Sequence, residues 1–344
     1  MDTITHGLTG WLVSRTLPTE GNRSEATAAT TLGAVLPDAD HIVSLLGGSE
    51  MYVRFHRGLS RSLLGITVSS LVVAILFARF GKWKDRKRIF LLTLLGQLSH
   101  VVLDLLNAYG TQVLAPFSDV RLSLDLLFVV DLVFTGIILA GIALSRNGRA
   151  GSARIALAVL AGYVGVAALL HARAVDMVRD AAVRHGVPVV SAQALPRLAT
   201  VEIPDLDRFG FASPAVASTA AGGSEGGVAV VPFPAGPFAW DGFIDDGRTY
   251  LRARIEPFSG ALEWKERALR GPDVPEVRSL RGMSDVETYL WFARFPVARV
   301  TVANGRTEVT FYDMRFDGIA GRRPPFRLRV TGHPGAPPSA RWGG

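Results

Sequence analysis

Two residues able to bind a metal ion lie four positions apart in an apolar stretch of the sequence. His100 and Asp104 belong to Arg88–Leu106, which otherwise has the length and composition of a membrane-spanning helix. A spacing of four places both side chains on one face of a helix. Ionisable groups inside a span are expensive and tend to be functional. Because a bound cation lowers the cost of burying a carboxylate, the pair predicts a metal site.

Other potential ligands flank neighbouring apolar segments. The chain has no cysteine, and four of its seven histidines (His6, His41, His56 and His100) occur in the first 100 residues. Histidine nitrogen and carboxylate oxygen are the usual ligands of catalytic zinc when cysteine is absent. Each residue alone has a plainer interpretation, such as a local hydrogen bond or a helix stop, but together they favour a divalent ion, with zinc preferred. The predicted ligands are His6, Asp38, Asp40, His56, His100 and Asp104.

The apolar segments predict the elements that position these residues. Ile4–Thr16 and Glu25–Leu36 are too short to span a bilayer, which favours a helical hairpin. The predicted spans are Ser62–Phe80, Arg88–Leu106, Leu124–Leu144 and Ala153–His171. We therefore expect an α-helical membrane bundle of about four spanning helices plus an N-terminal short hairpin, followed by a small β-rich soluble domain. In this arrangement all candidate ligands emerge at the same membrane face.

The composition changes after residue 173. We expect domains at 1–173 and 228–344, with 174–227 forming an amphipathic extension and a Pro/Gly/Ser-rich linker that includes Ser213–Gly227. Alternating β-prone residues predict strands in six later runs. These runs are VAVVPF, TYLRARIEP, ETYLWFARF, ARVTVAN, TEVTFYDMRF and FRLRV.

Charge distribution predicts the orientation in the membrane. The formal net charge is +7, but the basic residues are scattered or lie in short loops, which favours membrane orientation over nucleic-acid binding. Gly81–Arg88 holds five Lys or Arg residues, and Ser145–Arg154 holds three more. These loops are expected to be cytoplasmic, which places the metal site and the β-rich domain outside. The N-terminal segment lacks a signal-peptide pattern and is expected to be retained.

Five motifs in this order resemble the YdjM-like family of predicted membrane-bound metal-dependent hydrolases, and the two-part layout resembles its YfhP-type members. The motifs are THGLTG (Thr5–Gly10), GAVLPDAD (Gly33–Asp40), HRGLSRS (His56–Ser62), SHVVLDLLNAYGTQVLAPFSD (Ser99–Asp119) and LDLLFVVD (Leu124–Asp131). The β-rich part is similar through PFAWDG, ARFPVARV and YDMRF. The family usually has a second histidine where this chain has Arg61. If that histidine binds metal in the family, this chain has lost a ligand, or Asp125 replaces it. The resemblance also implies a bacterial inner (cell) membrane.

A more distant resemblance links the order of these residues to zinc phospholipase C and the single-strand-specific nucleases. It implies that Asp40, His56, His100 and Asp104 hold one zinc ion, and that His6 approaches a second ion bridged by Asp104. A second His-x-x-x-Asp motif of those enzymes has no counterpart in this sequence.

The sequence predicts a membrane-embedded hydrolase that cleaves phosphoesters of a lipid or lipid-linked substrate with a metal-activated water. Asp38 or Asp125 would orient the water as general base, and Arg57 and Arg61 would hold phosphate oxygens. The alternative is a non-enzymatic, metal-stabilised scaffold, or an ion or metal transporter, with a sensory β domain. Transport is disfavoured because the polar residues lie at one end of the spans and the sequence has no repeat. A structural metal would have four protein ligands, whereas catalysis requires an open position.

Overall fold

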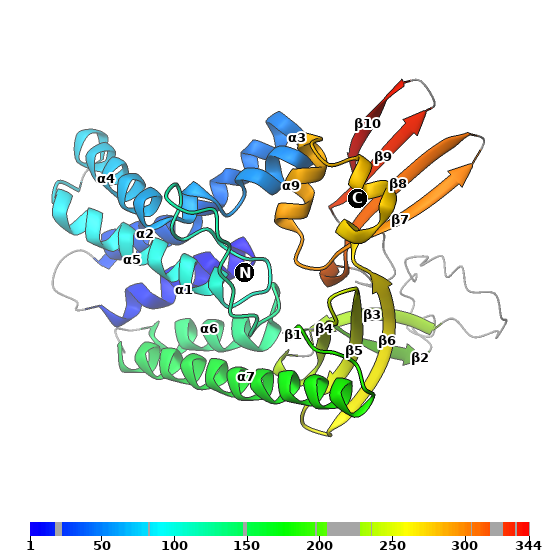
Figure 1. Ribbon diagram of the computed structural model, residues 1–344. Coiled ribbons are helices and arrows are strands. Elements are labelled where there is room, and N and C mark those ends of the chain that lie inside the picture. Colours follow the sequence, from blue (N-terminus) through cyan, green and yellow to red (C-terminus); the bar gives the residue numbers. More distant parts are fainter. Residues whose placement is uncertain are drawn as a thin grey trace.

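The structure is a computed structural model. The structure describes residues 1–17, 23–81, 83–146, 150–196, 198–204, 228–234, 236–303, 305–316, 326–333 and 336–343. The linker predicted at Ser213–Gly227 lies outside the described residues. Helices fill the N-terminal half of the chain and β-strands dominate the C-terminal half, at opposite sides of the molecule (Figure 1).

The described part of the N-terminal half contains seven α-helices, most of which pack into a bundle. Two short helices, α1 and α2, make the expected hairpin, and α3 follows a 3-10 turn at Leu36–His41. The helices are α1 (Thr3–Thr16), α2 (Arg23–Val35), α3 (Ile42–Phe55), α4 (Leu63–Phe80), α5 (Arg86–Leu105), α6 (Leu132–Leu144) and α7 (Ala150–Arg184). Polar side chains begin several of them: Asp2, Ser62, Asp85 and Asp131 each accept a backbone N–H of the first turn.

Within the described residues, three helices are long and apolar enough to cross a membrane, namely α4, α5 and α7. Their outward faces expose large apolar side chains, including Leu71, Ile75, Val102 and Leu169, as expected of surfaces that meet lipid. The predicted fourth span is not confirmed. Its first eight residues, Leu124–Asp131, are not helical, so α6 is only 13 residues long.

Helices α2 and α5 pack with close backbones because a glycine on each helix faces the backbone of the other. A Cβ on Gly33 would collide with the Thr93 carbonyl, and one on Gly96 would collide with the Thr30 carbonyl. This contact matters because the C-terminal part of α5 carries His100 and Asp104 one and two turns beyond Gly96. Small residues are what allow helix backbones to approach in this way.

The β-rich half contains two four-stranded antiparallel sheets, with strand orders β1-β4-β5-β6 and β10-β9-β8-β7, and a separate pair β2-β3. The strands are β1 (Ser191–Pro196), β2 (Leu198–Pro204), β3 (Val228–Pro234), β4 (Trp240–Asp245), β5 (Thr249–Glu256), β6 (Ala261–Leu269), β7 (Pro296–Ala303), β8 (Arg306–Asp313), β9 (Arg327–His333) and β10 (Ala336–Gly343). Strand β1 therefore lies within the stretch expected to be extension and linker.

Two short helices, α8 (Pro275–Ser279) and α9 (Ser284–Phe292), pack with the second sheet. The run ETYLWFARF is predicted to form a strand. This prediction is wrong, because most of the run lies in α9. Two of its β-prone residues also satisfy a helical spacing, since Tyr289 and Phe292 are buried together with the preceding Val286. Tertiary packing therefore overrides local propensity here.

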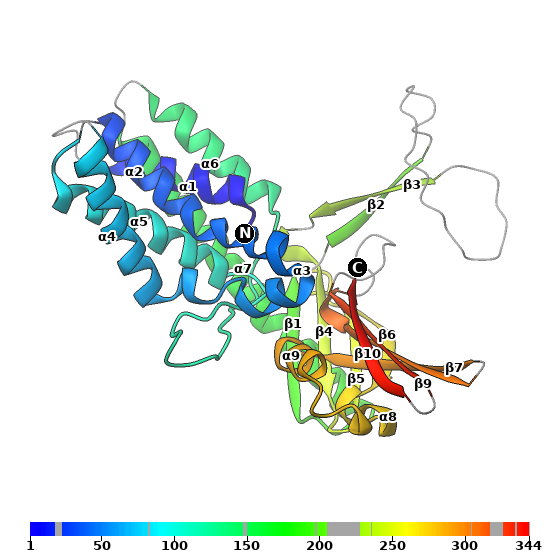
Figure 2. The ribbon, with the colours of Figure 1, turned by 90° about the horizontal axis from the view of Figure 1, so that it is seen from above.

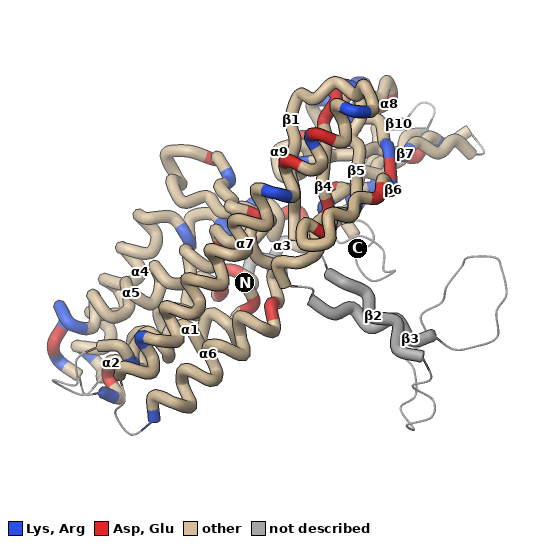
Figure 3. Tube along the Cα trace, turned by 90° about the horizontal axis from the view of Figure 1, so that it is seen from below, with Lys and Arg blue, Asp and Glu red and all other residues tan. Residues whose placement is uncertain are grey.

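Helix α7 connects the two halves physically. Figures 1 and 2 show it running along the bundle and on to the first sheet. Near its C-terminal end, Ala174, Val178 and Ala182 are fully buried in one core with Trp240 and Ile244 of β4. Lys and Arg gather at the end of the bundle away from the β elements, and most of the helical tube carries no charge (Figure 3).

Candidate metal centre

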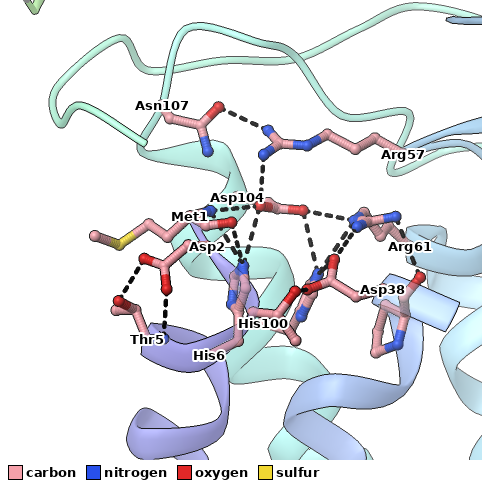
Figure 4. Close-up of polar contacts among 12 residues, drawn as sticks. Met1, Asp2, Thr5, His6, Asp38, Arg57, Arg61, His100, Asp104 and Asn107 are labelled. Carbon is pink, nitrogen blue, oxygen red and sulfur yellow. Dashed lines mark hydrogen bonds and ion pairs between the residues drawn. The ribbon is translucent and has the colours of Figure 1, made fainter. Parts of the chain in front are cut away.

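A buried group of three potential ligands lies between α1 and α5. His6, His100 and Asp104 are fully buried, and their ligand atoms lie within 4.8 Å of one another. Asp104 Oδ1 is 3.3 Å from His6 Nε2, and Asp104 Oδ2 is 3.2 Å from His100 Nε2. The two imidazole rings stack, with 3.6 Å between centroids. Figure 4 shows these side chains converging on the Asp104 carboxylate.

The orientation of His100 fits a metal ligand. Its Nδ1 lies 2.7 Å from the Ala34 carbonyl of α2. Because a carbonyl can only accept, Nδ1 carries a proton, and Nε2 is turned towards Asp104. Histidines that bind metal are characteristically held by such an outer hydrogen bond. The close approach of α2 and α5 at Gly96 sets this geometry, and two imidazoles with one carboxylate suit zinc.

A second group of potential ligands contains Asp40, His41 and His56. The 3-10 turn that follows α2 carries Asp40, and His56 directly follows α3. Asp40 Oδ1 lies 2.9 Å from His56 Nδ1. Burial lowers the pKa of His56 to about 4, although the hydrogen bond with Asp40 acts in the opposite direction. Burial disfavours the Asp40 carboxylate, but His56 and Arg61 outweigh it and hold the Asp40 pKa well below its usual range.

Arg61 lies between the two groups and contacts both. Its side chain is 1% exposed. Nε donates to Asp104 Oδ2 at 2.6 Å and to His100 Nε2 at 3.1 Å, while Nη1 and Nη2 donate to Asp40 and Asp38. All three guanidinium nitrogens thus have partners inside the cluster. The sequence predicts a different role, in which Arg61 holds phosphate oxygens. Burial opposes the charge, but Asp104, Asp40 and Asp38 raise the Arg61 pKa above its usual value.

Arg57 contacts the same carboxylate from the other side. It has a left-handed backbone with φ of 61°, and its Nη2 lies 3.1 Å from Asp104 Oδ1. Nη1 donates to Asn107 Oδ1 at 2.6 Å, and the guanidinium lies 4.7 Å from the Tyr109 ring centre. The amino group of Met1 also donates to Asp104 Oδ1, at 2.8 Å.

A cavity of about 430 Å³ borders the cluster. Asp38, His56 and Arg57 form its polar wall. Burial opposes ionisation of Asp38, but the charges of His100 and Arg61 and a hydrogen bond from Thr3 lower its pKa. Both halves of the chain contribute the apolar wall, which includes Leu127, Phe128, Leu195, Phe316 and Phe326. The candidate ligands therefore adjoin a cavity that the β-rich half helps to close.

Among the predicted site residues, Asp125 has its described contacts outside the ligand cluster. Its two carboxylate oxygens accept from Arg294 at 2.8 and 2.9 Å, so it pairs with the β-rich half. Gln193 and Ser123 also accept from Arg294. The other predicted residues, His6, Asp38, Asp40, His56, Arg57, Arg61, His100 and Asp104, come together in the cluster or its rim.

The sequence interpretation missed several members of the site. Asn107 follows Asp104 by three positions but lies past the end of α5, and its contact with Arg57 joins distant segments. His41 was noted but not assigned as a ligand. Tyr109, Arg315 and Phe326 line the cavity, and the sequence carries no local signal for them because their contacts join distant segments. Arg315 Nη1, for example, donates to the Ala108 carbonyl at 2.8 Å.

Comparisons with known proteins agree with the helical half. Residues 1–174 of the 344 match the family described as YdjM inner membrane protein. A relative from Bacillus subtilis (strain 168), the uncharacterized protein YfhP, is 32% identical over 147 residues, which cover 42% of this chain and 45% of the relative. The match thus spans less than half of that protein's length. No solved structure matches the chain. Because the family match covers just over half of the chain and contains the whole ligand cluster, the protein belongs to the YdjM inner membrane protein family.

Proposed function

We propose that the protein is a membrane-embedded, metal-dependent hydrolase of phosphoesters. The observation that carries this proposal is the buried group His6, His100 and Asp104 in contact with Asp38 and Arg57, which line a cavity large enough for a substrate headgroup. A divalent ion held there would polarise a phosphoryl oxygen and activate a water molecule. His6, His100 and Asp104 would be its ligands, and Asp40 and His56 would stand next to them.

The charges around the cavity favour an anionic substrate. Asp38, Asp40 and Asp104 face the guanidinium groups of Arg57 and Arg61 in a buried setting. A divalent cation would add positive charge beyond what these carboxylates balance, which favours a phosphate group. Arg57 lines the cavity, and its buried Nε has no hydrogen-bond partner among the described residues. We therefore assign phosphate binding to Arg57 rather than to Arg61.

Asp38 suits the orientation of a water molecule better than removal of its proton. It lines the cavity, and its lowered pKa makes the carboxylate a weak base. The apolar wall, including Leu127 and Phe326, suits an acyl or prenyl chain. A lipid or lipid-linked phosphoester is thus the proposed substrate class. By the positive-inside rule, the site and the β-rich half would lie on the extracytoplasmic side.

The test is hydrolysis of a phosphomonoester and phosphodiester panel, with lipid and water-soluble members, by detergent-purified protein loaded with Zn²⁺. We expect His100→Ala to lose bound zinc and hydrolysis together. His185→Ala is the matched control because His185 is exposed and directly follows the C-terminal end of α7. Hydrolysis that persists in His100→Ala, or absence of hydrolysis by the wild type, would sink the enzyme proposal.

A second candidate function follows from Arg61. Its guanidinium already satisfies Asp38, Asp40 and Asp104, so the cluster can tie α1, α5 and the turns around Asp38 and Arg61 together without catalysis. In that case the protein would be a scaffold that carries the β-rich half. The discriminating result is a wild type that binds zinc at a site with four protein ligands and hydrolyses no member of the panel.

A further inference from the structure

The two ligand groups of the cluster are separated by a single cationic side chain. His6, His100 and Asp104 form one group, and Asp40, His41 and His56 form the other. Arg61 touches Asp104 and His100 in the first group through Nε, and Asp40 in the second through Nη1. Its Nη2 donates to Asp38. One guanidinium therefore meets three carboxylates from two different segments of the chain.

Burial makes this contact an alternative to a metal ion. The Arg61 side chain is 1% exposed, and those of Asp38, Asp40 and Asp104 are 8%, 9% and 0% exposed. Buried carboxylates need a compensating charge. A guanidinium supplies one with directed donors in a planar fork, which a divalent ion would otherwise supply as a point charge. Like charges a few ångströms apart repel strongly in such a setting.

We propose that Arg61 holds the place of a second divalent ion, so that the group around Asp40 and His56 stays metal-free while Arg61 is present. The chain would then bind its exchangeable ion only at His6, His100 and Asp104, where the ion would replace the Nε contacts of Arg61 while Nη1 and Nη2 stay on Asp40 and Asp38. The inference concerns the same cluster as the proposed function, but it predicts ion number and not hydrolysis. It also assigns Arg61 a structural charge in place of the phosphate contact expected from the sequence.

The test counts ions in purified full-length protein that has been stripped with a chelator, reloaded with Zn²⁺ and freed of excess metal. We expect Arg61→His to hold one ion more per chain than the wild type, because an imidazole offers a ligand and removes the competing charge. Arg54→His is the matched control: Arg54 is exposed on α3, and the substitution adds a histidine outside the cluster. It should leave the ion count unchanged.

Two further variants locate the added ion. Arg61→His combined with His56→Ala should return the count to that of the wild type, because the second group loses a ligand. Arg61→Lys should keep the wild-type count, since the ammonium retains the charge, but should lower the melting temperature because one ammonium cannot reach three carboxylates. An equal count in the wild type and Arg61→His would overturn the proposal, as would an extra ion that survives His56→Ala.

Folding provides an independent readout. If stripped Arg61→His is unstable, Zn²⁺ should raise its melting temperature by more than that of the wild type, because the ion then supplies the missing charge. Failure of Arg61→His to fold with Zn²⁺ as well as without it would overturn the proposal. If the wild type holds no ion and Arg61→His holds one, the proposal on Arg61 stands, but the metal-dependent hydrolase proposal fails. If the wild type holds one ion and hydrolyses no substrate, only the hydrolase proposal fails.

Discussion

At the scale of single residues, Asp104 is where the contacts of the cluster meet. Its carboxylate is fully buried and contacts groups on three segments of the chain. These partners are Met1, His6, Arg57, Arg61 and His100. A buried anion of this kind is tolerable only because every neighbour compensates it. The same residue therefore matters for stability and for the proposed metal binding.

Replacing Asp104 with Asn should destabilise the protein strongly. The change leaves Arg57 and Arg61 buried with less compensation, and breaking a buried ion pair from one side costs about 3–5 kcal/mol. Asp176→Asn is the control, because the Asp176 side chain is 70% exposed and its pair with Arg179 is on the surface. Equilibrium unfolding in detergent, with metal chelated, measures both. Equal stability of the two variants would contradict the buried network.

At the scale of elements, the packing of α2 against α5 determines where the histidine of α5 points. Gly96 faces the Thr30 carbonyl without room for a Cβ. One turn further on, His100 Nδ1 reaches the Ala34 carbonyl of the same neighbouring helix. The hydrogen bond and the glycine contact therefore depend on one interhelical distance.

Gly96→Ala should weaken metal binding although residue 96 contacts no ligand atom. The added methyl group forces the two helices apart, at about 1–3 kcal/mol of stability, and lengthens the bond that orients His100. Gly162→Ala on α7 is the control, since nothing lies within 4 Å of its added Cβ. Zinc titration and thermal unfolding would check this. Unchanged zinc affinity in Gly96→Ala would show that the helix spacing does not control the ligand.

The hairpin between β4 and β5 should carry an acid-sensitive contact. Burial opposes ionisation of Asp246, but hydrogen bonds from Thr249, Arg248 and Arg267 lower its pKa to about 2, against 3.8 in the unfolded chain. The contribution to stability is therefore complete above pH 3.8 and lost as pH falls towards 2. Asp246→Ala should remove this part of the acid dependence and cost about 1 kcal/mol at neutral pH. Thermal unfolding of both proteins at several pH values measures it, and parallel pH profiles would refute it.

At the scale of the whole molecule, an ion pair joins the membrane-facing half to the β-rich half. Asp125 and Arg294 meet through two hydrogen bonds, and Arg315 reaches the loop after α5 through the Ala108 carbonyl. Asp125 adopts a left-handed backbone with φ of 58°, which an aspartate tolerates better than most residues. These contacts hold the wall of the cavity that the β-rich half supplies.

Asp125→Asn and Arg294→Gln should have similar and non-additive effects. Each breaks the same contact, so a double-mutant cycle should give a coupling of about 0.5–3 kcal/mol, and amide exchange in strand β1 should increase in both variants. If Asp125 were instead a general base, Asp125→Asn alone would abolish hydrolysis while Arg294→Gln left it intact. Measuring turnover and exchange on all four proteins separates these roles.

The sequence was informative where a single segment carries the signal. Apolar runs predicted the hairpin and three long helices, and the spacing of His100 and Asp104 predicted a shared face. It was uninformative where distant segments meet. The Arg61 contacts with three carboxylates, and the Asp125 partner 169 positions away, depend on tertiary structure. The break at Leu124–Asp131 was missed because an apolar run reads as helix whether or not its backbone bends to meet α5.

The length of α7 has a practical consequence. Its 35 residues extend about 52 Å, whereas the hydrocarbon layer of a bilayer is about 30 Å thick. The surplus turns supply Ala174, Val178 and Ala182 to the interior of the first sheet, where Gly242 leaves space for Val178. A truncation of α7 at the lipid surface therefore does not give an intact β-rich fragment. A fragment that begins at β1 would expose the apolar face of the first sheet and aggregate. A fragment that begins near residue 172 would include the part of α7 that covers this face.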